Sequence, residues 1–350
     1  MMCRRVIFCV LLFAMAGAVG VGAGALPVGE IEMVADFDGA YGEYPEGVAV
    51  DKRGNVFVSM SHLGEVWKFP PRGDASVVCH IDLDNSFFNF GVVGLAVDAP
   101  GNVYAAVASL DPATQGIYRI GRKGEGCERI PGTEDLGFAD GLAFTDGLAF
   151  DKRGNLFVTE ADEGAIYRID RRGNIELWLQ HPLLEGTGSS YGFVRIGANG
   201  IQYWKNSLIV ANSELFLIVK VPILPNGDPG EPEILYDAFI SLDPLAFEFF
   251  PDGIALDVFG NIYVADPPLS QVYFVAADGS YAMPLATWET VLDNPTSLAF
   301  GTGKGDRKNL FVVNFDLLTP EQEAGLGVPV NGDGPSLVKM GTGNPGNPLP

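Results

Sequence analysis

Histidine and cysteine are scarce in this 350-residue chain, which has three of the first and four of the second. Zinc sites in proteins are built mainly from these two residue types, so the sequence offers little for a zinc centre. Lysine and arginine are also few, 22 against 44 aspartates and glutamates, and the formal net charge is −22. Such a field repels nucleic acid and anionic membranes and attracts cations, or it serves solubility alone. We expect no nucleic-acid partner.

One long apolar run stands at the N-terminus, where Arg4 and Arg5 precede the apolar residues 6–19 and the small residues 23–25. This order is typical of a secretory signal peptide, so we expect residues 1–25 to be removed from a secreted or periplasmic protein. After cleavage we expect no stable membrane insertion. An uncleaved run would instead anchor the chain in a membrane.

A loose pattern, Pro-(acid or amide)-Gly-Val-Ala-Val-Asp-x-x-Gly-Asn-Val-Phe-Val, recurs along the chain. In the three central copies, the residue before the repeated glycine is Asp146, Asn199 or Asp252, so 199 − 146 and 252 − 199 both equal 53. A fixed period of this size indicates a repeat architecture.

Each repeat contains four short β-rich runs separated by Gly, Asp and Asn turns, and six such units can be counted. The sixth lacks a fourth strand before residues 341–350, which we expect to form a flexible tail, whereas residues 30–37 resemble a fourth strand. We therefore predict an all-β fold over residues 26–340, a six-bladed β-propeller with four antiparallel strands per blade. The N-terminal strand would close the last blade and leave no open sheet edge. The repeat count argues against a seven-bladed ring or an open sandwich.

Two cysteines, Cys79 and Cys127, remain after the predicted cleavage and occupy equivalent places in consecutive repeats. We expect them on separated outer strands, whereas a disulfide needs Cα atoms within about 7 Å. Export would permit a bridge, so the sequence leaves their pairing open.

The residues just before each blade's first strand should gather at one mouth of the central channel. In blade order they are Glu46, Val93, Asp146, Asn199, Asp252 and Thr296. Asp-Gly and Asn-Gly are ordinary turn pairs, but turn formation does not explain a glutamate in blade one or a valine in blade two. Three carboxylates in a narrow channel repel one another unless a cation lies between them. We therefore predict that Glu46, Asp146, Asn199 and Asp252 hold Ca²⁺, or Mg²⁺ or another hard divalent cation.

Other loops should reach the same mouth and form a substrate pocket. The candidates there are His62, Phe90, Glu160, Asn212 and Asp266. His62 is the only histidine so placed, and it is a candidate proton shuttle or an ordinary surface residue. The aromatic residues of the crossing loops favour a small-molecule substrate with apolar character, and residues 315–335 are a candidate lid or a variable surface loop.

The blade-by-blade order Glu46, Asp146, Asn199, Asp252 resembles the senescence marker protein/gluconolactonase/LRE-like family of calcium-dependent propeller hydrolases, with paraoxonases and strictosidine synthase-like proteins more distantly. The resemblance implies a calcium site made of a Glu from blade one, Asn from blades three and four, and an Asp from blade five. It also implies that a carboxylate acts as base or nucleophile. Asp146 departs from this pattern, and its extra charge should bind the metal more tightly while making it a weaker electrophile. A second copy of the same short sequence directly precedes the copy that contains Asp146, so Asp140 is the alternative ligand of blade three.

These observations predict an exported, calcium-dependent lactonase or esterase in which Asp252 or Asp146 activates water or attacks directly. The blades also resemble NHL repeats, for example at residues 251–257 and 260–266. Propellers of that kind are often binding platforms. The alternative is therefore a non-catalytic propeller that binds a protein or a glycan.

Overall fold

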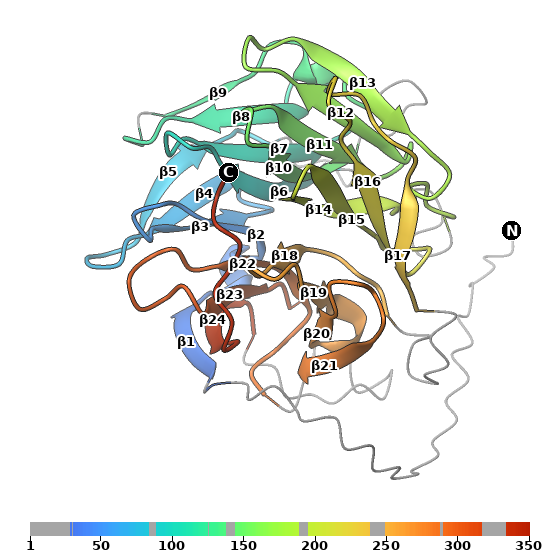
Figure 1. Ribbon diagram of the computed structural model, residues 1–350. Helices are drawn as coiled ribbons and strands as arrows, with labels where there is room; N and C mark the ends of the chain where they lie inside the picture. The colour runs from blue at the N-terminus through green and yellow to red at the C-terminus, as the bar shows by residue number, and fades with distance from the viewer. Residues whose placement is uncertain are drawn as a thin grey trace, which may run out of the picture.

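Six four-stranded antiparallel sheets surround a central axis in the computed structural model (Figure 1). The structure describes residues 29, 31–83, 89–124, 126–137, 144–188, 195–238, 249–287, 290–316 and 334–350. The predicted six-bladed β-propeller is confirmed. The predicted signal peptide, residues 1–25, lies outside the described residues, and within these ranges no helix is long and apolar enough to cross a membrane.

The strands of each blade run in sequence from the channel outward in blades one to five. Blade one contains β2 (Pro45–Val50), β3 (Val56–Met60), β4 (Glu65–Phe69) and β5 (Ser76–His80); blade two contains β6 (Asn89–Val97), β7 (Val103–Ser109), β8 (Gly116–Ile120) and β9 (Cys127–Arg129); blade three contains β10 (Thr145–Phe150), β11 (Leu156–Glu160), β12 (Ala165–Ile169) and β13 (Ile175–Gln180). Blade four contains β14 (Ala198–Trp204), β15 (Ser207–Asn212), β16 (Leu217–Pro222) and β17 (Glu233–Asp237); blade five contains β18 (Ile254–Leu256), β19 (Ile262–Asp266), β20 (Gln271–Val275) and β21 (Ala282–Ala286).

Blade six joins the two ends of the chain. It consists of β22 (Pro295–Phe300), β23 (Asn309–Asn314), β24 (Ser336–Gly341) and, outermost, β1 (Ile31–Asp36). β1 pairs antiparallel with β24, with Ile31 opposite Met340 and Asp36 opposite Ser336. The predicted closure by the N-terminal strand is confirmed, and the otherwise open edge of β24 is paired.

The turn between the first two strands of a blade is stabilised by its own aspartate. In blade one, Asp51 Oδ1 accepts hydrogen bonds from the backbone N–H groups of Arg53 and Asn55, and Gly54 adopts a φ of 80°. Blades three and five repeat this arrangement around Asp151 and Asp257. The turn therefore satisfies its own polar groups and leaves the tip side chains free to face solvent.

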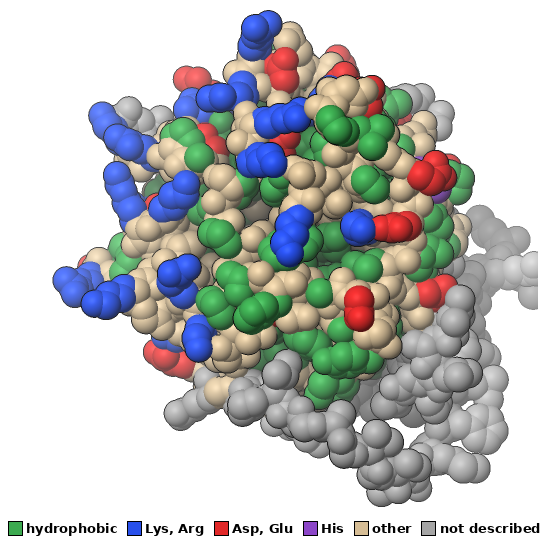
Figure 2. Space-filling model, in the orientation of Figure 1, with side chains coloured by type: hydrophobic (Ala, Val, Ile, Leu, Met, Phe, Trp, Pro, Cys, Tyr) green, Lys and Arg blue, Asp and Glu red, His purple; other side chains and the backbone are tan. Residues whose placement is uncertain are grey.

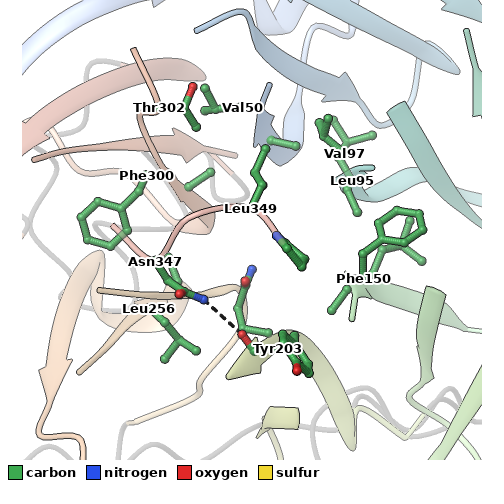
Figure 3. A pocket seen from close by; sticks show the side chains of 18 of the residues that line it. Val50, Leu95, Val97, Phe150, Tyr203, Leu256, Phe300, Thr302, Asn347 and Leu349 are labelled. Carbon is green, nitrogen blue, oxygen red and sulfur yellow. Dashed lines mark hydrogen bonds between the residues drawn. The ribbon is translucent and has the colours of Figure 1, made fainter. Parts of the chain in front are cut away.

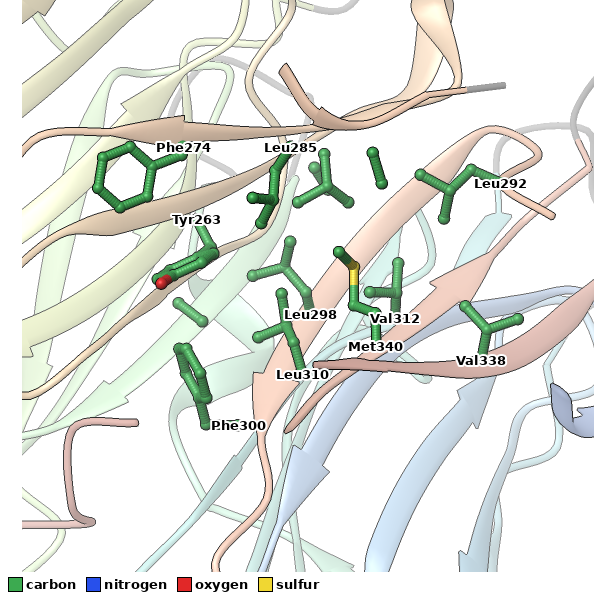
Figure 4. Packing of buried hydrophobic residues seen from close by; sticks show 14 of the residues in the cluster. Tyr263, Phe274, Leu285, Leu292, Leu298, Phe300, Leu310, Val312, Val338 and Met340 are labelled. Carbon is green, nitrogen blue, oxygen red and sulfur yellow. The ribbon is translucent and has the colours of Figure 1, made fainter. Parts of the chain in front are cut away.

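Neighbouring blades pack face to face, and large side chains fill the space between them. Figure 4 shows the cluster between blades five and six, where Tyr263 and Phe274 of one sheet meet Phe300, Leu310 and Met340 of the next. The Tyr263 and Phe300 rings meet edge to face at 5.1 Å between centroids. Because both faces of each sheet are covered, the central strands read as nearly continuous apolar runs.

Residues 342–349 lie against the channel end opposite the mouth. The Val258 N–H donates to Pro345 O, and Asn347 donates to Leu256 O and Tyr203 O. Leu349 approaches the apolar wall near Leu95 and Val97, beside a cavity of about 100 Å³ (Figure 3). The segment that we expected to be a flexible tail thus makes hydrogen bonds to blades four and five and covers this end of the channel.

A disulfide joins Cys79 of β5 to Cys127 of β9, with a Cα–Cα distance of 5.3 Å. The expectation that these cysteines lie on separated strands is wrong. Because consecutive blades pack face to face, their outer strands are neighbours, and Cys79 is buried in the cluster against which Cys127 packs. The bridge fastens blade one to blade two at the rim.

Removing this bridge should destabilise the protein. The cysteines are 48 residues apart, and closing a loop of that length in the unfolded chain corresponds to about 2–4 kcal/mol. We expect a Cys79→Ala, Cys127→Ala variant to lose that much free energy of unfolding in urea titrations. Dithiothreitol should destabilise the wild type and leave the variant unchanged; equal stability of both proteins without reductant would contradict the prediction.

Candidate functional site

The candidate site lies where the innermost strands bulge at the mouth. The antiparallel register shifts between Pro45 and Val48 in β2, and at the equivalent points of β10 and β14. A bulge interrupts the regular alternation of side chains along a strand, so it can turn a side chain toward the other face of the sheet. Glu46, Asp146 and Asn199 therefore lie within the bulged starts of these strands, and Asp252 directly precedes Gly253 and β18.

All four predicted ligands line one cavity of about 40 Å³, together with Thr296 of blade six. Asp146 and Asn199 are buried, whereas Glu46 and Asp252 are partly exposed. Val93 does not line the cavity, because its side chain packs in the core between blades two and three. The structure thus brings together the residues that the sequence singled out.

A collar of apolar side chains lies directly below the acidic ring, one from each blade, two residues after each mouth position. Its members are Val48, Leu95, Leu148, Ile201, Ile254 and Leu298. Three of them, Val48, Leu95 and Leu148, also wall the cavity beside residues 347–350, so the two cavities are stacked along the channel. This collar places the carboxylates against apolar surface, which penalises their charged forms.

Burial and mutual repulsion dominate the electrostatics of the ring. Burial raises the pKa of Asp146 to about 7. Burial, followed by the charges of Asp146 and Asp252, raises the pKa of Glu46 well above its usual value. For Asp252, burial and then Asp146 raise the pKa, while a hydrogen bond from Asn199 opposes the rise.

Among the described residues, no positive side chain compensates these three carboxyl groups. Within the described ranges, none of the ion pairs includes Glu46, Asp146 or Asp252. Glu46 Oε2 is buried and has no hydrogen-bond partner. The hard oxygen donors and this unpartnered atom fit a cation such as Ca²⁺. The described part of the chain nevertheless contains no group of three or more Asp, Glu, His or Cys side chains close enough together to hold a metal ion.

Hydroxyl groups on the second strands support the ring from behind. Ser59 Oγ accepts a hydrogen bond from the Gly47 N–H at 2.6 Å and donates to Val93 O at 2.8 Å. Thr159 Oγ1 does the same in blade three, accepting from Gly147 N and donating to Asn199 O. Each hydroxyl therefore ties the residue after one mouth position to the backbone of the next blade.

Two further hydroxyls complete this support. Ser213 Oγ accepts from Asn199 Nδ2 at 3.1 Å and donates to Pro251 O, next to Asp252. Thr296 Oγ1 donates to Glu46 O at 2.8 Å and joins blade six to blade one. Sequence reasoning missed Ser59, Thr159 and Ser213, although a small hydroxyl residue near the end of the second strand was the available signal.

The repeated glycine after each mouth position allows the blades to approach closely. A Cβ on Gly47 would lie 2.2 Å from Val93 O, and one on Gly147 would lie 2.5 Å from Asn199 O. Gly94, Gly200 and Gly253 face the next blade in the same way. The glycine of the motif is thus required for packing at the axis, while the residue before it faces the cavity.

Three of the predicted pocket residues are fully buried and do not line the cavity. Glu160 accepts hydrogen bonds from the N–H groups of Phe144 and Glu163, and Asn212 donates to Leu183 O and Glu185 O. Asp266 accepts from the Phe250 N–H at 3.2 Å. These side chains fasten blade-crossing segments to the ends of second strands, and burial raises the pKa of Glu160 to about 8.

The other two predicted pocket residues lie in aromatic clusters. His62 is exposed and contacts the rings of Tyr44 and Phe315 at 5.4 and 5.9 Å between centroids, and partial burial lowers its pKa. Phe90 packs edge to face on Phe144 at 4.7 Å. The alternative ligand Asp140 lies outside the described residues, as does most of the candidate lid.

Two sequence features were missed. Gln202, three residues after Asn199 on β14, lines both the acidic cavity and the cavity below the collar. The sequence Gly-Ser-Ser-Tyr-Gly at 188–192 matches the Gly-x-Ser-x-Gly pattern of serine hydrolases. Of these five residues, only Gly188 is described.

The hydroxyl support can be tested with Thr159→Val. This change keeps the branched shape but leaves Gly147 N and Asn199 O without their hydroxyl partner, which should cost about 1–3 kcal/mol of unfolding free energy. Urea titration measures it. Thr290→Val is the matched control, because Thr290 is exposed and its hydroxyl donates to Thr287 O within its own turn. An equal loss in both variants would contradict a special role for Thr159.

The raised pKa of Asp146 predicts a pH dependence of stability in the metal-free protein. Between its usual value of 3.8 and about 7, the folded state holds a proton that the unfolded state releases. The free energy of unfolding should therefore fall as the pH rises through this range, by about 1.4 kcal/mol per unit of pKa shift at most. Asp146→Asn should flatten the dependence in urea titrations with EGTA, and the exposed Asp74→Asn should not. An undiminished pH dependence in Asp146→Asn would refute the assignment.

Comparison with solved structures identifies similar propellers. A luciferin-regenerating enzyme superposes with a TM-score of 0.66 at 15% identity, covering 92% of this chain and 98% of that one. A putative gluconolactonase gives 0.61 at 15% identity, with coverage of 93% and 95%, and the calcium-binding protein regucalcin from Agrobacterium tumefaciens gives 0.60 at 16%, with 88% and 93%. Virginiamycin B lyase from Staphylococcus aureus is more distant, with 0.53 at 14% identity and coverage of 90% and 99%.

The sequence comparisons give no match. No protein-family model matches the chain, and no curated protein is similar to it in sequence. At these identities the structural likeness establishes the fold. The chain therefore has the six-bladed fold of the luciferin-regenerating enzyme, the putative gluconolactonase and regucalcin, the kinds of propeller that its motifs resemble.

Proposed function

We propose that the protein is an exported hydrolase that opens a lactone or ester at the acidic mouth of its channel, with a divalent cation, calcium foremost, held by Glu46, Asp146, Asn199 and Asp252. One observation carries the proposal. Four oxygen-bearing side chains from four blades line a single cavity, and the three carboxyl groups among them have raised pKa values and no ion-pair partner among the described residues.

The bound cation would supply Lewis acidity toward a substrate carbonyl. Asp252 is the first candidate for the base or nucleophile, because it is partly exposed to the cavity and the neighbouring Asn199 side chain favours its charged form. Asp146 is the second candidate, since a pKa of about 7 lets it take or release a proton near neutral pH. The four hydroxyl contacts behind the ring hold these groups in place.

The shape of the channel indicates how a substrate would approach. A cavity of about 40 Å³ has room for an ion or a few water molecules and no room for a lactone ring. The apolar collar and residues 342–349 close the path from below. The reacting carbonyl would therefore enter from the mouth, where Tyr44, Phe315 and Phe90 provide apolar contacts.

Two other findings support parts of this proposal. One structural neighbour is described as a calcium-binding protein and another as a putative gluconolactonase. The Cys79–Cys127 disulfide suits an oxidising compartment, as export would provide.

Calcium binding is the direct test of the ring. We expect isothermal titration to give one site, and Glu46→Gln or Asp146→Asn to weaken it at least about tenfold, since each removes a charged ligand. Glu160→Gln is the matched control, because Glu160 is a buried carboxylate of blade three that does not line the cavity. Elemental analysis that finds no metal, together with no calcium binding, would refute the metal site.

Activity should be assayed with a panel of aromatic and aliphatic lactones and esters. We expect EGTA to abolish hydrolysis and Asp252→Asn to lower kcat by about 100-fold or more, with metal occupancy checked separately. Asp146→Asn should raise the calcium requirement; a similar fall in kcat at saturating calcium would transfer the role of base to Asp146. Full activity in excess EGTA would contradict the proposal.

The alternative, a non-catalytic platform, is favoured by the finding that no three Asp, Glu, His or Cys side chains among the described residues are gathered closely enough to hold a metal ion. It predicts ligand binding without turnover. Such binding should survive an Asn199→Ala, Asp252→Ala double variant, because the ring would then be dispensable.

A further inference from the structure

The face opposite the acidic mouth carries a concentration of positive charge (Figure 2). It is formed by the turns between first and second strands and between third and fourth strands. We name it the basic face, after the exposed residues Lys52, Arg53, Arg72, Arg122, Lys123, Lys152, Arg153, Arg171, Arg172, Lys205, Lys304, Arg307 and Lys308. More than half of the chain's 22 lysines and arginines thus lie on one face of a protein whose net charge is −22.

These basic side chains are not neutralised by the acids beside them. In the described ranges none of them takes part in an ion pair. The turn aspartates, such as Asp51 and Asp151, are buried and bonded to the turn itself. Among the described residues the exposed acids on the same turns are fewer, namely Asp74, Asp228, Glu231 and Asp278.

Exposed apolar side chains interrupt the basic face at blades four and five. The turn that reads Asp-Lys-Arg-Gly in blades one and three reads Asp257-Val258-Phe259-Gly260 in blade five, so Phe259 takes the place of an arginine. Phe259 is 63% exposed, Tyr281 of the neighbouring turn 51%, and Leu224 of blade four 41%. These three side chains are available to a partner surface that is itself partly apolar.

A pocket of about 240 Å³ lies on the basic face between blades three and four. Lys152 and Arg153 line one side, and Tyr203, Asn206 and Leu224 line the other. Asp151 also lines it, with both carboxylate oxygens bonded within its turn. The pocket therefore offers two cations and polar donors next to an exposed leucine, the combination that a phosphate headgroup with its acyl chain requires.

We propose that the basic face docks on the surface of a membrane that contains anionic phospholipids. Lysine and arginine side chains contact the headgroup phosphates, the pocket between blades three and four takes one headgroup, and Phe259, Tyr281 and Leu224 enter the interfacial layer. A membrane suits the arrangement better than a nucleic acid, because the turns of all blades end on one face of a disc and the apolar tips have no counterpart on a polyphosphate backbone.

The segregation of charge also fixes an orientation. Net charge alone predicts repulsion from anionic membranes, because it treats the charge as evenly distributed. In the structure, more than half of the lysines and arginines lie on one face, and the carboxylate ring lies at the opposite mouth. The surface field would then attract one face and repel the other. The mouth would point away from the membrane and stay open to solvent.

Vesicle co-sedimentation tests the proposal with the full mature chain. We expect binding to vesicles of phosphatidylcholine mixed with phosphatidylglycerol, weak binding to phosphatidylcholine alone, and loss of binding in molar salt. Replacing Lys52, Arg53, Lys152 and Arg153 by Ser should lower the partition coefficient by about tenfold or more, since each basic residue near the surface contributes to attraction. Phe259→Ser should weaken binding at all salt concentrations while keeping its salt dependence.

The matched control removes the same charge elsewhere. Lys68, Arg119, Lys220 and Lys339 lie on third strands, outside the basic face, and their replacement by Ser should leave vesicle binding within about twofold of wild type. Equal losses in both quadruple variants, or equal binding to neutral and anionic vesicles, would overturn the proposal. Binding of heparin or single-stranded RNA without vesicle binding would overturn it too and assign the face to a soluble polyanion. Thermal unfolding of each variant verifies that it is folded.

Discussion

The close approach of six backbones at one axis is the constraint on which the rest of the structure depends. A glycine in one inner strand lies against the carbonyl oxygen of the mouth residue in the next blade, and at Gly47 even a Cβ would reach 2.2 Å from that oxygen. Hydroxyls at Ser59 and Thr159 tie the same backbone segments together. The side chain before each glycine is thereby aimed at a cavity that it shares with its equivalents, so blade packing and the acidic site have one origin.

The same constraint explains what the sequence could and could not predict. The period of 53 residues and the recurring turns predicted the blades, their closure by β1, and the four side chains at the mouth, because these depend on local pattern and symmetry. The Cys79–Cys127 bridge depends on the distance between outer strands of different blades, which a repeat pattern does not contain. Three predicted pocket residues do end their strands on the mouth side, namely Glu160, Asn212 and Asp266. Hydrogen bonds to the crossing segments hold these side chains in the protein interior, so they do not line the cavity.

The net charge of the chain says little about its binding partners, because it does not show where the charges lie. The value of −22 is a sum over a molecule whose mouth gathers buried carboxyl groups while the opposite face gathers exposed lysines and arginines. In blades one and three the turn sequence Asp-Lys-Arg-Gly-Asn contributes four of these cations, because its aspartate accepts the hydrogen bonds of the turn and its lysine and arginine are left at the tip. Turns of different sequence on the same face supply the other exposed lysines and arginines, and together they form a polarised surface.

The carboxyl group of Asp146 bears on the energetics of the mouth. A carboxyl group with a pKa of about 7 is half protonated near neutral pH, so the metal-free ring need not carry three full charges. A cation that binds there must displace this proton, and its affinity will therefore rise with pH. An asparagine at the same place would carry no titratable proton, so no proton would compete with the cation there. In the proposed metal site, Asp146 would thus couple metal affinity to pH over the neutral range, whereas an asparagine in its place would leave that coupling to Glu46 and Asp252 alone.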